Sequence, residues 1–395
     1  MNVWHGNGVD RLIYNNDESQ LFDLAESFAQ NRLASQVLLH EQQHVFPRDL
    51  LMELGDIGLL TLPFAHIADP KAENIPYRVS LQILEILSSA WLSLAVSLSV
   101  HHLSCAPLIK FGNQEQKERW VNWTLSGNSI GAYCLSEPQS GSDAAALETK
   151  AIREGSNYRI TGTKAWITHG GVADFYILFA RTGPDKTRGI SCFFIPADTP
   201  GIDFGKPETK MALNSSPTAQ IYFNDAIISS DHLIGREGEG FAIALSSLDV
   251  GRLGIAACAV GLAQSALNLA SEYASKRVAF EQRIDNFQGV AFMLADMATS
   301  VEASRSLYVN AAAQHDVGSS ISKIASMAKL LSTDSAMNVT TDAVQILGGN
   351  GYTADYNAER YMREAKVLQI VEGTNQIQRV VISRELQSRH DKGSM

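Results

Sequence analysis

The sequence has few cysteines and no pattern that would join them. Four occur in 395 residues, none in a Cys-x-x-Cys pair: Cys105, Cys134, Cys192 and Cys258. This spacing excludes a disulfide framework and a cysteine zinc site, and it suits free thiols in a reducing compartment. The N-terminal stretch also lacks the charged and apolar regions of a secretory signal and the Arg-rich pattern of a transit peptide. We therefore expect a cytoplasmic protein.

Basic runs are also missing. The formal net charge is −10 at pH 7, and no Lys/Arg-rich segment offsets it. Phosphate repulsion would oppose nucleic-acid binding, so we expect no nucleic-acid partner. One nearly apolar run, 253–270, is interrupted by Gln264, Ser265 and Asn268. Its many small residues favour a buried helix of a bundle over a membrane span.

Two ligand-binding motifs are absent or incomplete. No Gly-x-Gly-x-x-Gly follows a strand-like run, so a dinucleotide held as in a Rossmann fold is not expected. Residues 40–44, His-Glu-Gln-Gln-His, do match the His-Glu-x-x-His pattern of zinc proteases. Phe46 and Pro47 end that helix at once, and no third ligand stands at a recognised spacing. We therefore expect a solvated helix end and no metal.

The spacing of apolar residues changes twice along the chain, from helical to alternating and back to helical. This pattern predicts an α+β fold of three domains. These are an N-terminal α-helical domain (1–126), a middle antiparallel β domain (127–235) and a C-terminal α-helical domain of four-helix-bundle type (236–395). Apolar residues at helical spacing predict helices within 18–34, 46–60, 78–102, 239–281, 286–317 and 319–348. Short alternating runs between turn residues predict strands at 158–168, 174–181, 189–195, 201–205 and 220–224.

One acidic residue stands in an unusual place. A mostly apolar, strand-like run precedes Glu372, and Gly373 then frees the backbone to turn. Thr374 lies where the N-cap of a following amphipathic helix would be. Burial would raise the pKa of the Glu372 carboxylate, and the positive end of that helix would lower it. From spacing alone, neutralising the helix start is the favoured role for Glu372, and acting as a general base is the alternative.

Two segments together resemble one enzyme family. Residues 366–379, Lys-Val-Leu-Gln-Ile-Val-Glu-Gly-Thr-Asn-Gln-Ile-Gln-Arg, resemble the Tyr-Glu-Gly-Thr-x-x-Ile-Gln-Arg signature of the acyl-CoA dehydrogenases. Residues 133–143, Tyr-Cys-Leu-Ser-Glu-Pro-Gln-Ser-Gly-Ser-Asp, resemble the flavin motif of the same family. Two motifs in the family's order and separation are hard to obtain by chance, and the α, β, α-bundle order is also that of the family. The resemblance reverses the preference at Glu372 in favour of the base.

The resemblance implies an FAD enzyme of the short- and medium-chain-like subclass. The isoalloxazine ring would lie against the β domain, with the Ser136 hydroxyl able to donate towards flavin N5. The flavin residues that it implies within one chain are Tyr133, Leu135, Ser136, Gly141, Ser142, Trp166, Thr168, Thr374 and Gln376. A neighbouring subunit would supply Arg277, Phe280, Gln345, Gly348 and Gly349 at the pyrophosphate end. An obligate homotetramer or homodimer would follow.

The reaction implied by the resemblance is the α,β-dehydrogenation of an acyl thioester. Glu372 would remove the α-proton while the β-hydrogen leaves as hydride to flavin N5, giving a trans-2-enoyl thioester. Some relatives carry the base near residue 251, but Gly251 can perform no proton chemistry. Electrons would pass to an electron-transferring flavoprotein. The resemblance places these residues at the CoA thioester: Ser142, Asp249, Arg252, Gly373 and Arg384.

Two departures from the family pattern leave the substrate open. Val371 replaces the usual Tyr before the base, and Gln139 replaces a small residue of the flavin motif. Both are compatible with a specialised acyl group or with an acyl chain on a carrier protein instead of free CoA. Val96 and Ser99 fall on the helix that lines the acyl pocket in relatives. An oxidase of the same fold and a flavin-free, non-enzymatic homologue are the remaining alternatives.

Overall fold

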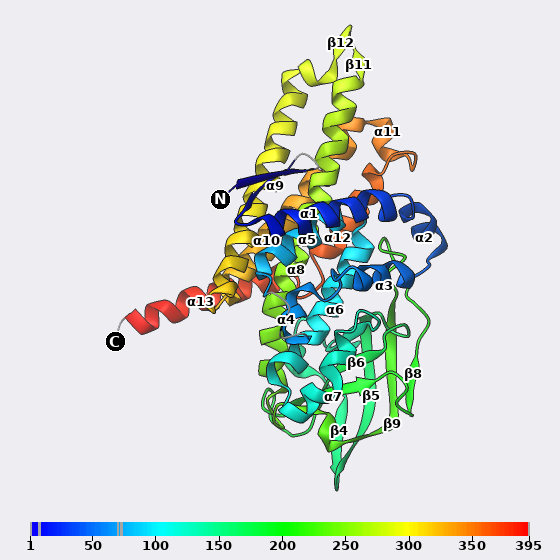
Figure 1. Cartoon of the computed structure of the whole chain (residues 1–395), viewed down its shortest axis with the longest axis vertical. Coiled ribbons are helices and arrows are strands. Elements are labelled where there is room, and N and C mark those ends of the chain that lie inside the picture. Colours follow the sequence, from blue (N-terminus) through cyan, green and yellow to red (C-terminus); the bar gives the residue numbers. More distant parts are fainter. Residues whose placement is uncertain (1, 7–8, 69–70, 72–73, 394–395) are drawn as a thin grey trace.

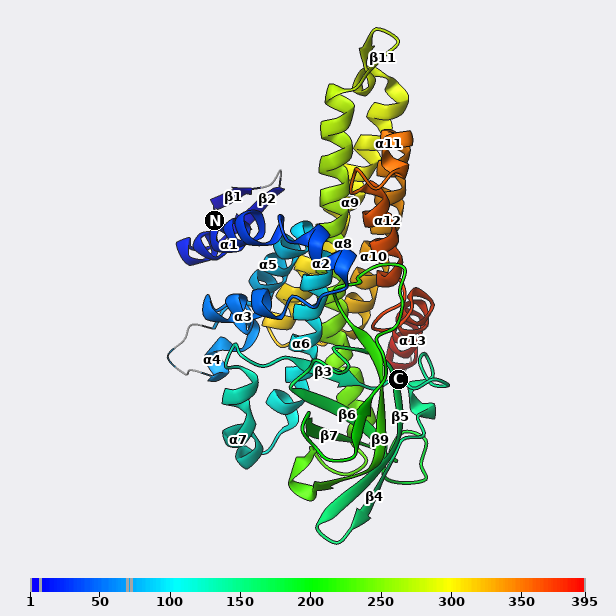
Figure 2. The same cartoon turned by 90° about the vertical axis from the view of Figure 1, so that its right-hand side faces the viewer.

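The computed structural model describes residues 2–6, 9–68, 71 and 74–393. Figures 1 and 2 show a sheet at one end of the molecule, helices packed on it, and two long helices that extend to a hairpin at the other end. The predicted order of a helical region, a β region and a second helical region is confirmed.

The N-terminal region is mostly helical, but it begins with a β-hairpin. Its elements are β1 Asn2–Gly6, β2 Val9–Ile13, α1 Asn16–Phe28, the π-helical η1 Ala29–Leu33, α2 Val37–Gln43, α3 Arg48–Asp56, η2 Leu62–Phe64, α4 Ala65–Ala68, α5 Tyr77–Ala90, α6 Leu92–Phe111 and α7 Gln114–Thr124. The all-helical prediction is therefore wrong at the start of the chain. In β2 the buried face carries Val9, Arg11 and Ile13, while Leu12 is exposed, so a buried arginine hides the period-two alternation.

The apolar stretch 78–102, predicted as one helical segment, contains a break between two helices. Trp91 separates α5 from α6 with an extended backbone, φ −155° and ψ 103°. Its ring is fully buried, and its Nε1 donates to the Glu41 carboxylate at 2.9 Å. Neither glycine nor proline marks this break, so the apolar period runs through it without a signal.

The middle region forms one eight-stranded sheet. Its elements are β3 Gly131–Cys134, η3 Ala144–Ala146, β4 Lys150–Glu154, β5 Asn157–Thr168, β6 Phe175–Arg181, β7 Ile190–Pro196, β8 Ile202–Phe204, β9 Thr218–Ser229, η4 Ser230–His232 and β10 Leu233–Ile234. The strand order is β10-β7-β6-β4-β5-β9-β8, and β3 lies beside β6. The pairing is mainly antiparallel as predicted, but β3 runs parallel to β6. One face of the sheet packs against α6, α7 and the next long helix, α8.

The C-terminal region is built from long helices joined by a small hairpin. Its elements are α8 Gly240–Lys276, β11 Val278–Ala279, β12 Gln282–Arg283, η5 Ile284–Asn286, α9 Gln288–Asp316, α10 Ser322–Leu347, α11 Gly349–Tyr352, α12 Ala358–Leu368 and α13 Asn375–Gly393. The segment predicted as helix up to residue 281 therefore ends at Lys276, before the β11–β12 hairpin. Helix α8 packs against α5, α6, α9 and α10, so both helical regions share one core.

Two helices, α6 and α8, are long and apolar enough to cross a membrane by length and composition alone. Inside the fold, 89% of the apolar window of α6 and 78% of that of α8 is buried. Both are core helices of the part of the chain that the structure describes.

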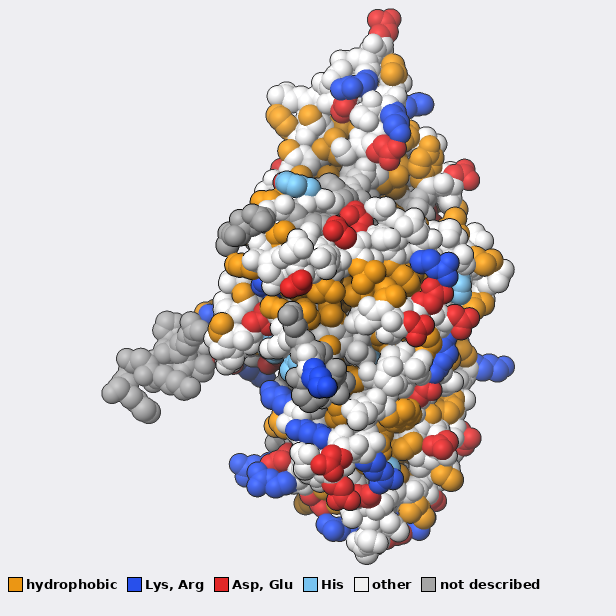
Figure 3. Space-filling view, viewed as in Figure 1, with side chains coloured by type: hydrophobic (Ala, Val, Ile, Leu, Met, Phe, Trp, Pro, Cys, Tyr) orange, Lys and Arg blue, Asp and Glu red, His pale blue; other side chains and the backbone are white. Residues whose placement is uncertain are grey.

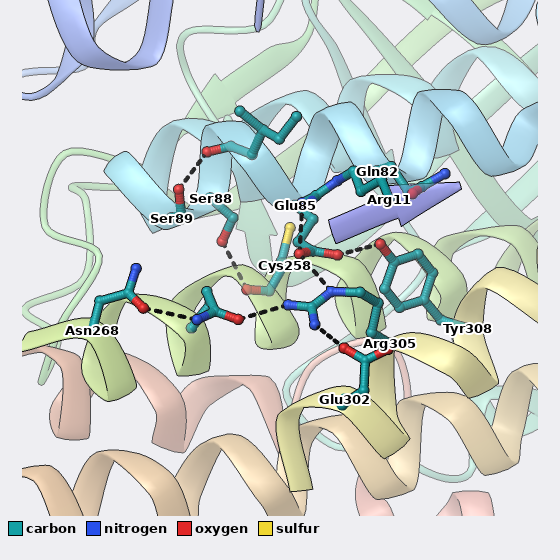
Figure 4. Close-up of polar contacts among 12 residues, drawn as sticks. Arg11, Gln82, Glu85, Ser88, Ser89, Cys258, Asn268, Glu302, Arg305 and Tyr308 are labelled. Carbon is teal, nitrogen blue, oxygen red and sulfur yellow. Dashed lines mark hydrogen bonds and ion pairs between the residues drawn. The ribbon is translucent and has the colours of Figure 1, made fainter. Parts of the chain in front are cut away.

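A buried ionic cluster joins the N-terminal hairpin to the two helical regions (Figure 4). The Glu85 carboxylate of α5 accepts from Arg11 Nη2 at 2.8 Å and from Arg305 Nε at 3.1 Å, and it also accepts the Tyr308 hydroxyl. Arg305 Nη2 donates to Gln264 Oε1 of α8 at 2.8 Å. The cationic partners hold the pKa of Glu85 below its usual range in spite of burial. This cluster fixes α5 against α8 and α9.

Candidate functional site

Glu372 lies in the turn formed by residues 369–374, between α12 and α13. It adopts a left-handed backbone with φ 52°, and Gly373 follows with φ 91°. The strand-like run predicted before Glu372 is wrong, because residues 358–368 are helical; a short apolar run cannot distinguish a buried helix end from a strand. A left-handed glutamate is strained, and such strain persists only where the surroundings hold it.

Side chains of α10 and α13 hold this turn in place. Lys329 Nζ of α10 donates to the Gly373 carbonyl at 3.0 Å and to Asn375 Oδ1 at 2.8 Å. Gln378 Nε2 donates to the same Gly373 carbonyl at 2.8 Å. Asn375 Nδ2 in turn donates to Asp334 Oδ1 at 2.7 Å. The turn that carries Glu372 is therefore fastened to α10, with Lys329 as the buried cation beneath it.

Both carboxylate oxygens of Glu372 are buried and have no hydrogen-bond partner among the described residues. Burial raises the pKa of Glu372 to about 8, although Lys329 and Arg252 act in the opposite direction. Burial likewise lowers the pKa of Lys329 to about 7, against the pull of the Glu372 carboxylate. A carboxylate with unused oxygens and a pKa near neutrality is poised to exchange a proton with a ligand.

The Glu372 carboxylate stands over Gly251 of α8. A Cβ atom on Gly251 would collide with Glu372 Oε2, so the absence of a side chain there makes room for the carboxylate. Gly251 also lines a narrow cavity between α5, α6 and α8, here called the Gly251 cavity. Its lining residues are Tyr77, Ser80, Leu81, Leu84, Ser99, His102, Leu103, Val250, Gly251 and Gly254.

The two residues predicted on the pocket helix are both on α6. Ser99 lines the Gly251 cavity, and Val96 is buried on the same helix. Tyr77 closes the cavity on the α5 side, and its hydroxyl donates to the Val250 carbonyl at 3.2 Å. Sequence reasoning missed the α5 lining residues, because α5 is buried on every side from Val79 to Ser88 and its pattern does not show which side faces a cavity.

The predicted flavin motif folds as a loop anchored by a buried ion pair. The Glu137 carboxylate accepts from Lys164 Nζ at 2.7 Å and from the backbone N–H groups of Glu148 and Thr149 at 2.6 and 2.9 Å. Burial opposes the charge, but Lys164 and these donors bring the pKa of Glu137 to about 2. Gln139, the unusual residue of the motif, also donates to Glu137, at 2.8 Å. Sequence reasoning missed Lys164, which sits in an ordinary strand pattern.

The structure brings most of the predicted ring-binding residues together. Tyr133 and Leu135 lie at the end of β3, and the Ser136 carbonyl accepts from the Ala165 N–H of β5 at 3.0 Å. The register of β5 slips between Lys164 and Ile167, and Trp166 in that bulge has φ 61° with 61% of its surface exposed. This bulge leaves the indole of Trp166 accessible on the surface. The remaining members are Thr168, half-buried at the end of β5, and Gly141 and Ser142, both exposed.

The residues predicted for the pyrophosphate lie elsewhere. Arg277 and Phe280 belong to the β11–β12 hairpin, at the opposite end of the molecule from the sheet (Figures 1 and 2). The Phe280 side chain is 90% exposed. The exposed Gln345, Gly348 and Gly349 follow one another at the end of α10 and the start of α11. Within one chain, therefore, these residues cannot reach a ligand that lies on Trp166.

Two of the residues predicted to bind the CoA thioester, Asp249 and Arg252, form a pair beside the Glu372 turn. Asp249 Oδ1 accepts from Arg252 Nη1 at 2.6 Å, and Arg252 is buried beside the Glu372 turn. Arg384 is exposed on α13. Thr374 is confirmed as the N-cap of α13, since its Oγ1 accepts from the N–H group of Ile377 at 3.3 Å. Gln376 is exposed one turn into the same helix.

The His-Glu-x-x-His segment serves the fold. Glu41 accepts from Trp91 Nε1 at 2.9 Å, from the Asn214 N–H at 2.8 Å and from the Ser215 hydroxyl at 2.6 Å. His44 ends α2 in a left-handed conformation, so the two imidazoles do not continue along one helical face. Glu41 thus ties α2 to α6 and to the loop before β9.

Three family models match consecutive parts of the chain. The acyl-CoA dehydrogenase N-terminal domain matches residues 15–128, the middle domain matches 132–226 and the C-terminal domain matches 238–387. Together they cover most of the 395 residues.

Individual relatives agree with these matches. An acyl-CoA dehydrogenase of Bacillus subtilis is 43% identical over 92% of this chain and 96% of its own. A short-chain-specific acyl-CoA dehydrogenase of Clostridium acetobutylicum is 39% identical over the same shares. Among solved structures, butyryl-CoA dehydrogenase of Megasphaera elsdenii has a TM-score of 0.93 at 35% identity, covering 95% of this chain and all of its own. A chain from a structure described as electron transferring flavoprotein of Acidaminococcus fermentans has a TM-score of 0.91 at 41% identity, covering 95% and 99%.

Proposed function

The chain belongs to the acyl-CoA dehydrogenase family of FAD-dependent enzymes, and on that basis we propose that Glu372 is the base of its acyl-CoA dehydrogenation. The observation that carries this proposal is the Glu372 carboxylate itself. Its two oxygens are buried, have no hydrogen-bond partner among the described residues, and lie against Gly251, which lines the Gly251 cavity. A thioester whose acyl chain enters this cavity would bring its α-carbon next to Glu372.

The residues of the β region fit a flavin. Trp166 presents an exposed indole from a bulge whose strained backbone has no role in sheet pairing, and a Cβ on Gly141 would meet only open space. Tyr133, Leu135, Ser136, Ser142 and Thr168 would surround the ring from the same strand ends, and Thr374 and Gln376 would approach it from α13. Bound FAD supplies the acceptor for the hydride that leaves the β-carbon.

Proton removal needs a base and a partner for the developing enolate oxygen. Glu372 takes the α-proton through an oxygen that no other group of the described residues occupies. The Glu372 N–H is the donor that we assign to the thioester oxygen. Lys329 and Arg252 supply positive charge beside the reacting carboxylate. The buried Asp249–Arg252 pair, the Gly373 backbone, Ser142 and the exposed Arg384 are assigned to the CoA thioester.

A homo-oligomer completes the cofactor site in this proposal. Arg277 and Phe280 lie at the far end of the molecule from Trp166, so a second copy must supply them to a pyrophosphate bound near the sheet. Exposed apolar side chains at that end, including Val278, Phe280 and Phe292, also need a cover. Figure 3 shows a band of hydrophobic side chains across the middle of one face, with charges of both signs around it. We assign a homodimer or homotetramer.

The substrate and partner follow the relatives. The short-chain-specific and butyryl-CoA relatives, together with the limited Gly251 cavity, favour a short acyl-CoA. Electron-transferring flavoprotein is the electron acceptor that we assign, given the similar chain found in a structure of that protein. The four cysteines are free and buried, as suits the reducing cytoplasm.

The test is flavin reduction by a substrate in the absence of oxygen. Mixing the purified enzyme anaerobically with butyryl-CoA should bleach the flavin absorbance near about 450 nm, and Glu372→Gln should slow this bleaching by about 10³-fold or more while keeping the flavin bound. Near-normal reduction in the variant would remove Glu372 as the base. Stoichiometric hydrogen peroxide from the enzyme in air, without an added acceptor, would show an oxidase instead.

A further inference from the structure

The lining of the Gly251 cavity combines leucine and valine side chains with the polar side chains of Ser80, Ser99 and His102. We propose that the cavity receives a short acyl group that carries an uncharged hydrogen-bonding group, a hydroxyl or a carbonyl, at the end remote from the thioester. Ser80, Ser99 and His102 are the residues that would bind this group. The inference rests on the proposed function, because it assumes that the acyl chain enters this cavity from Glu372.

Ser80 provides the main observation. It lies on α5, only 5% of its surface is exposed, and its hydroxyl oxygen is buried without a hydrogen-bond partner in the described part of the chain. Two other buried serines of these helices are satisfied, since Ser88 donates to the Cys258 carbonyl at 2.7 Å and Ser104 to the Val100 carbonyl at 2.7 Å. An unsatisfied hydroxyl is costly in an apolar site, so its presence at a cavity wall points to a partner that arrives from the cavity.

Ser99 adds a second hydroxyl from the opposite wall. It lies on α6 and is 3% exposed. A Cβ on Gly254 of α8 would collide with the Ser99 hydroxyl oxygen, so the glycine leaves room for that hydroxyl at the cavity. Two hydroxyl groups from different helices therefore line one small space whose other walls include Leu81, Leu84 and Leu103.

His102 adds a neutral acceptor. Its Nε2 lies 2.7 Å from the Leu60 carbonyl, which can only accept, so Nε2 carries the proton and Nδ1 remains an acceptor. Burial lowers the pKa of His102 to about 4, so the ring stays uncharged at neutral pH. The two serine hydroxyls can donate or accept, so the cavity can bind either a hydroxyl or a carbonyl oxygen.

The absence of charged side chains among the residues that line the Gly251 cavity favours an uncharged acyl group. None of the ten lining residues is Lys, Arg, Asp or Glu, and the Glu372 carboxylate lies over Gly251. A terminal carboxylate or ammonium would enter this cavity without a counter-ion, and an unpaired charge is strongly disfavoured there. Dicarboxylic acyl groups are thereby excluded, and neutral oxygenated ones are favoured.

The experiment compares acyl groups of nearly equal shape. kcat/KM is measured for 5-hydroxypentanoyl-CoA against hexanoyl-CoA, and for 4-oxopentanoyl-CoA against 4-methylpentanoyl-CoA. These ratios are determined for the wild type, for Ser80→Ala and for the control Ser88→Ala, which removes a buried hydroxyl of the same helix away from the cavity. We expect the oxygenated member of at least one pair to be preferred, and Ser80→Ala to reduce that preference about fivefold to tenfold. Ser88→Ala should leave the ratio unchanged.

Binding is measured separately from turnover. The Kd of each acyl-CoA for Glu372→Gln enzyme, followed by the change in flavin absorbance, should show the same preference and the same loss when Ser80→Ala is added. If the apolar members are preferred and Ser80→Ala moves both members of a pair equally, Ser80 binds only water and the inference is overturned. If Glu372→Gln still turns over at the wild-type rate, the proposed base fails, while the binding ratios still decide the inference.

Discussion

The Glu372 carboxylate destabilises the protein that carries it. It is buried with a strained left-handed backbone, and neither oxygen is bonded to another described residue. Two structural carboxylates look different: Glu137 and Glu85 are also buried, but each accepts several hydrogen bonds and has a lowered pKa. Groups kept at such a cost are typical of active sites.

Because the charged form of Glu372 is buried at a cost, the stability of the folded protein should depend on pH. Glu372 has a folded-state pKa of about 8 against an ordinary value of 4.5, so the folded state holds the proton more tightly between these values. Stability should therefore fall as pH rises from about 4.5 to about 8, and Glu372→Gln should lose this dependence. We expect equal Tm values for the two proteins near pH 5, and a Tm about 2–5 °C higher for Glu372→Gln near pH 8.5. Parallel Tm curves across this range would contradict the assigned pKa.

Lys329 should act on the reaction through Glu372. Replacing it by Met removes the cation that opposes the raised pKa of Glu372, and it leaves Gln378 as the remaining side-chain donor to the Gly373 carbonyl. We expect kcat to fall about tenfold to hundredfold, and the rising limb of kcat/KM against pH, set near pH 8 in the wild type, to move to higher pH. Lys323→Met, at a partly exposed position of the same helix, is the control. A lower Tm with an unmoved pH limb would mean that Lys329 only supports the fold.

The roles of single residues could be predicted from sequence where they depend on contacts with residues nearby in the chain. Thr374 could be placed at an N-cap from sequence because a cap depends on neighbours within one turn. Lys329 and Lys164 could not, since each is defined by a partner far along the chain, Gly373 for one and Glu137 for the other. Nothing in an amphipathic or alternating pattern marks a lysine that will be buried.

At the scale of elements, the site depends on glycines of α8 that let neighbouring groups approach this helix closely. Gly251, Gly254 and Gly261 recur along one side of α8, and a Cβ on each would collide with a different neighbour. At Gly251 that neighbour is the Glu372 carboxylate, at Gly254 the Ser99 hydroxyl, and at Gly261 the Glu85 carbonyl of α5. The same helix thus accommodates the base, the cavity and the packing of α5.

A methyl group on Gly251 should therefore displace the base without unfolding the chain. Alanine suits a helix better than glycine, but the Cβ atom would take the position of Glu372 Oε2. We expect Gly251→Ala to lower kcat/KM about 10²-fold, with a change in Tm of only a few degrees. Gly289→Ala, where a Cβ would meet nothing within 4 Å, is the matched control and should keep full activity. Full activity of Gly251→Ala would show that the carboxylate does not need this space.

Two features that sequence reasoning missed, the β1–β2 hairpin and the α5–α6 break, share one physical cause. The β1–β2 hairpin buries Arg11 on its inner face, and the α5–α6 break falls at a buried Trp91 with no glycine or proline beside it. In both places a tertiary contact with a distant residue decides the local structure, Glu85 for Arg11 and Glu41 for Trp91. The long helices and most strands, whose periods are strong and local, were predicted within a few residues.

For the whole molecule, the central fact is the separation of its two ends. The residues predicted around the flavin ring gather at the sheet, and those predicted around the pyrophosphate gather at the β11–β12 hairpin and α11 (Figures 1 and 2). Asn350 of α11 donates to the Tyr273 hydroxyl of α8 at 2.9 Å, so α11 is fastened to the hairpin end. No rearrangement of loops alone would bring the two groups together in one chain.

This separation makes a prediction about mixed oligomers. One variant, Arg277→Glu, lacks the cation assigned to the partner's cofactor, and another, Glu372→Gln, lacks its own base; each should be nearly inactive alone. When the two are co-expressed and assemble at random, half of the pairs are mixed, and one of the two sites in each mixed pair has both wild-type residues. We expect about a quarter of wild-type activity in the mixture, and about half of the full FAD content because the Glu372→Gln chains keep Arg277. If Arg277 instead served the site of its own chain, every site in every pair would carry a defect and mixing would restore nothing.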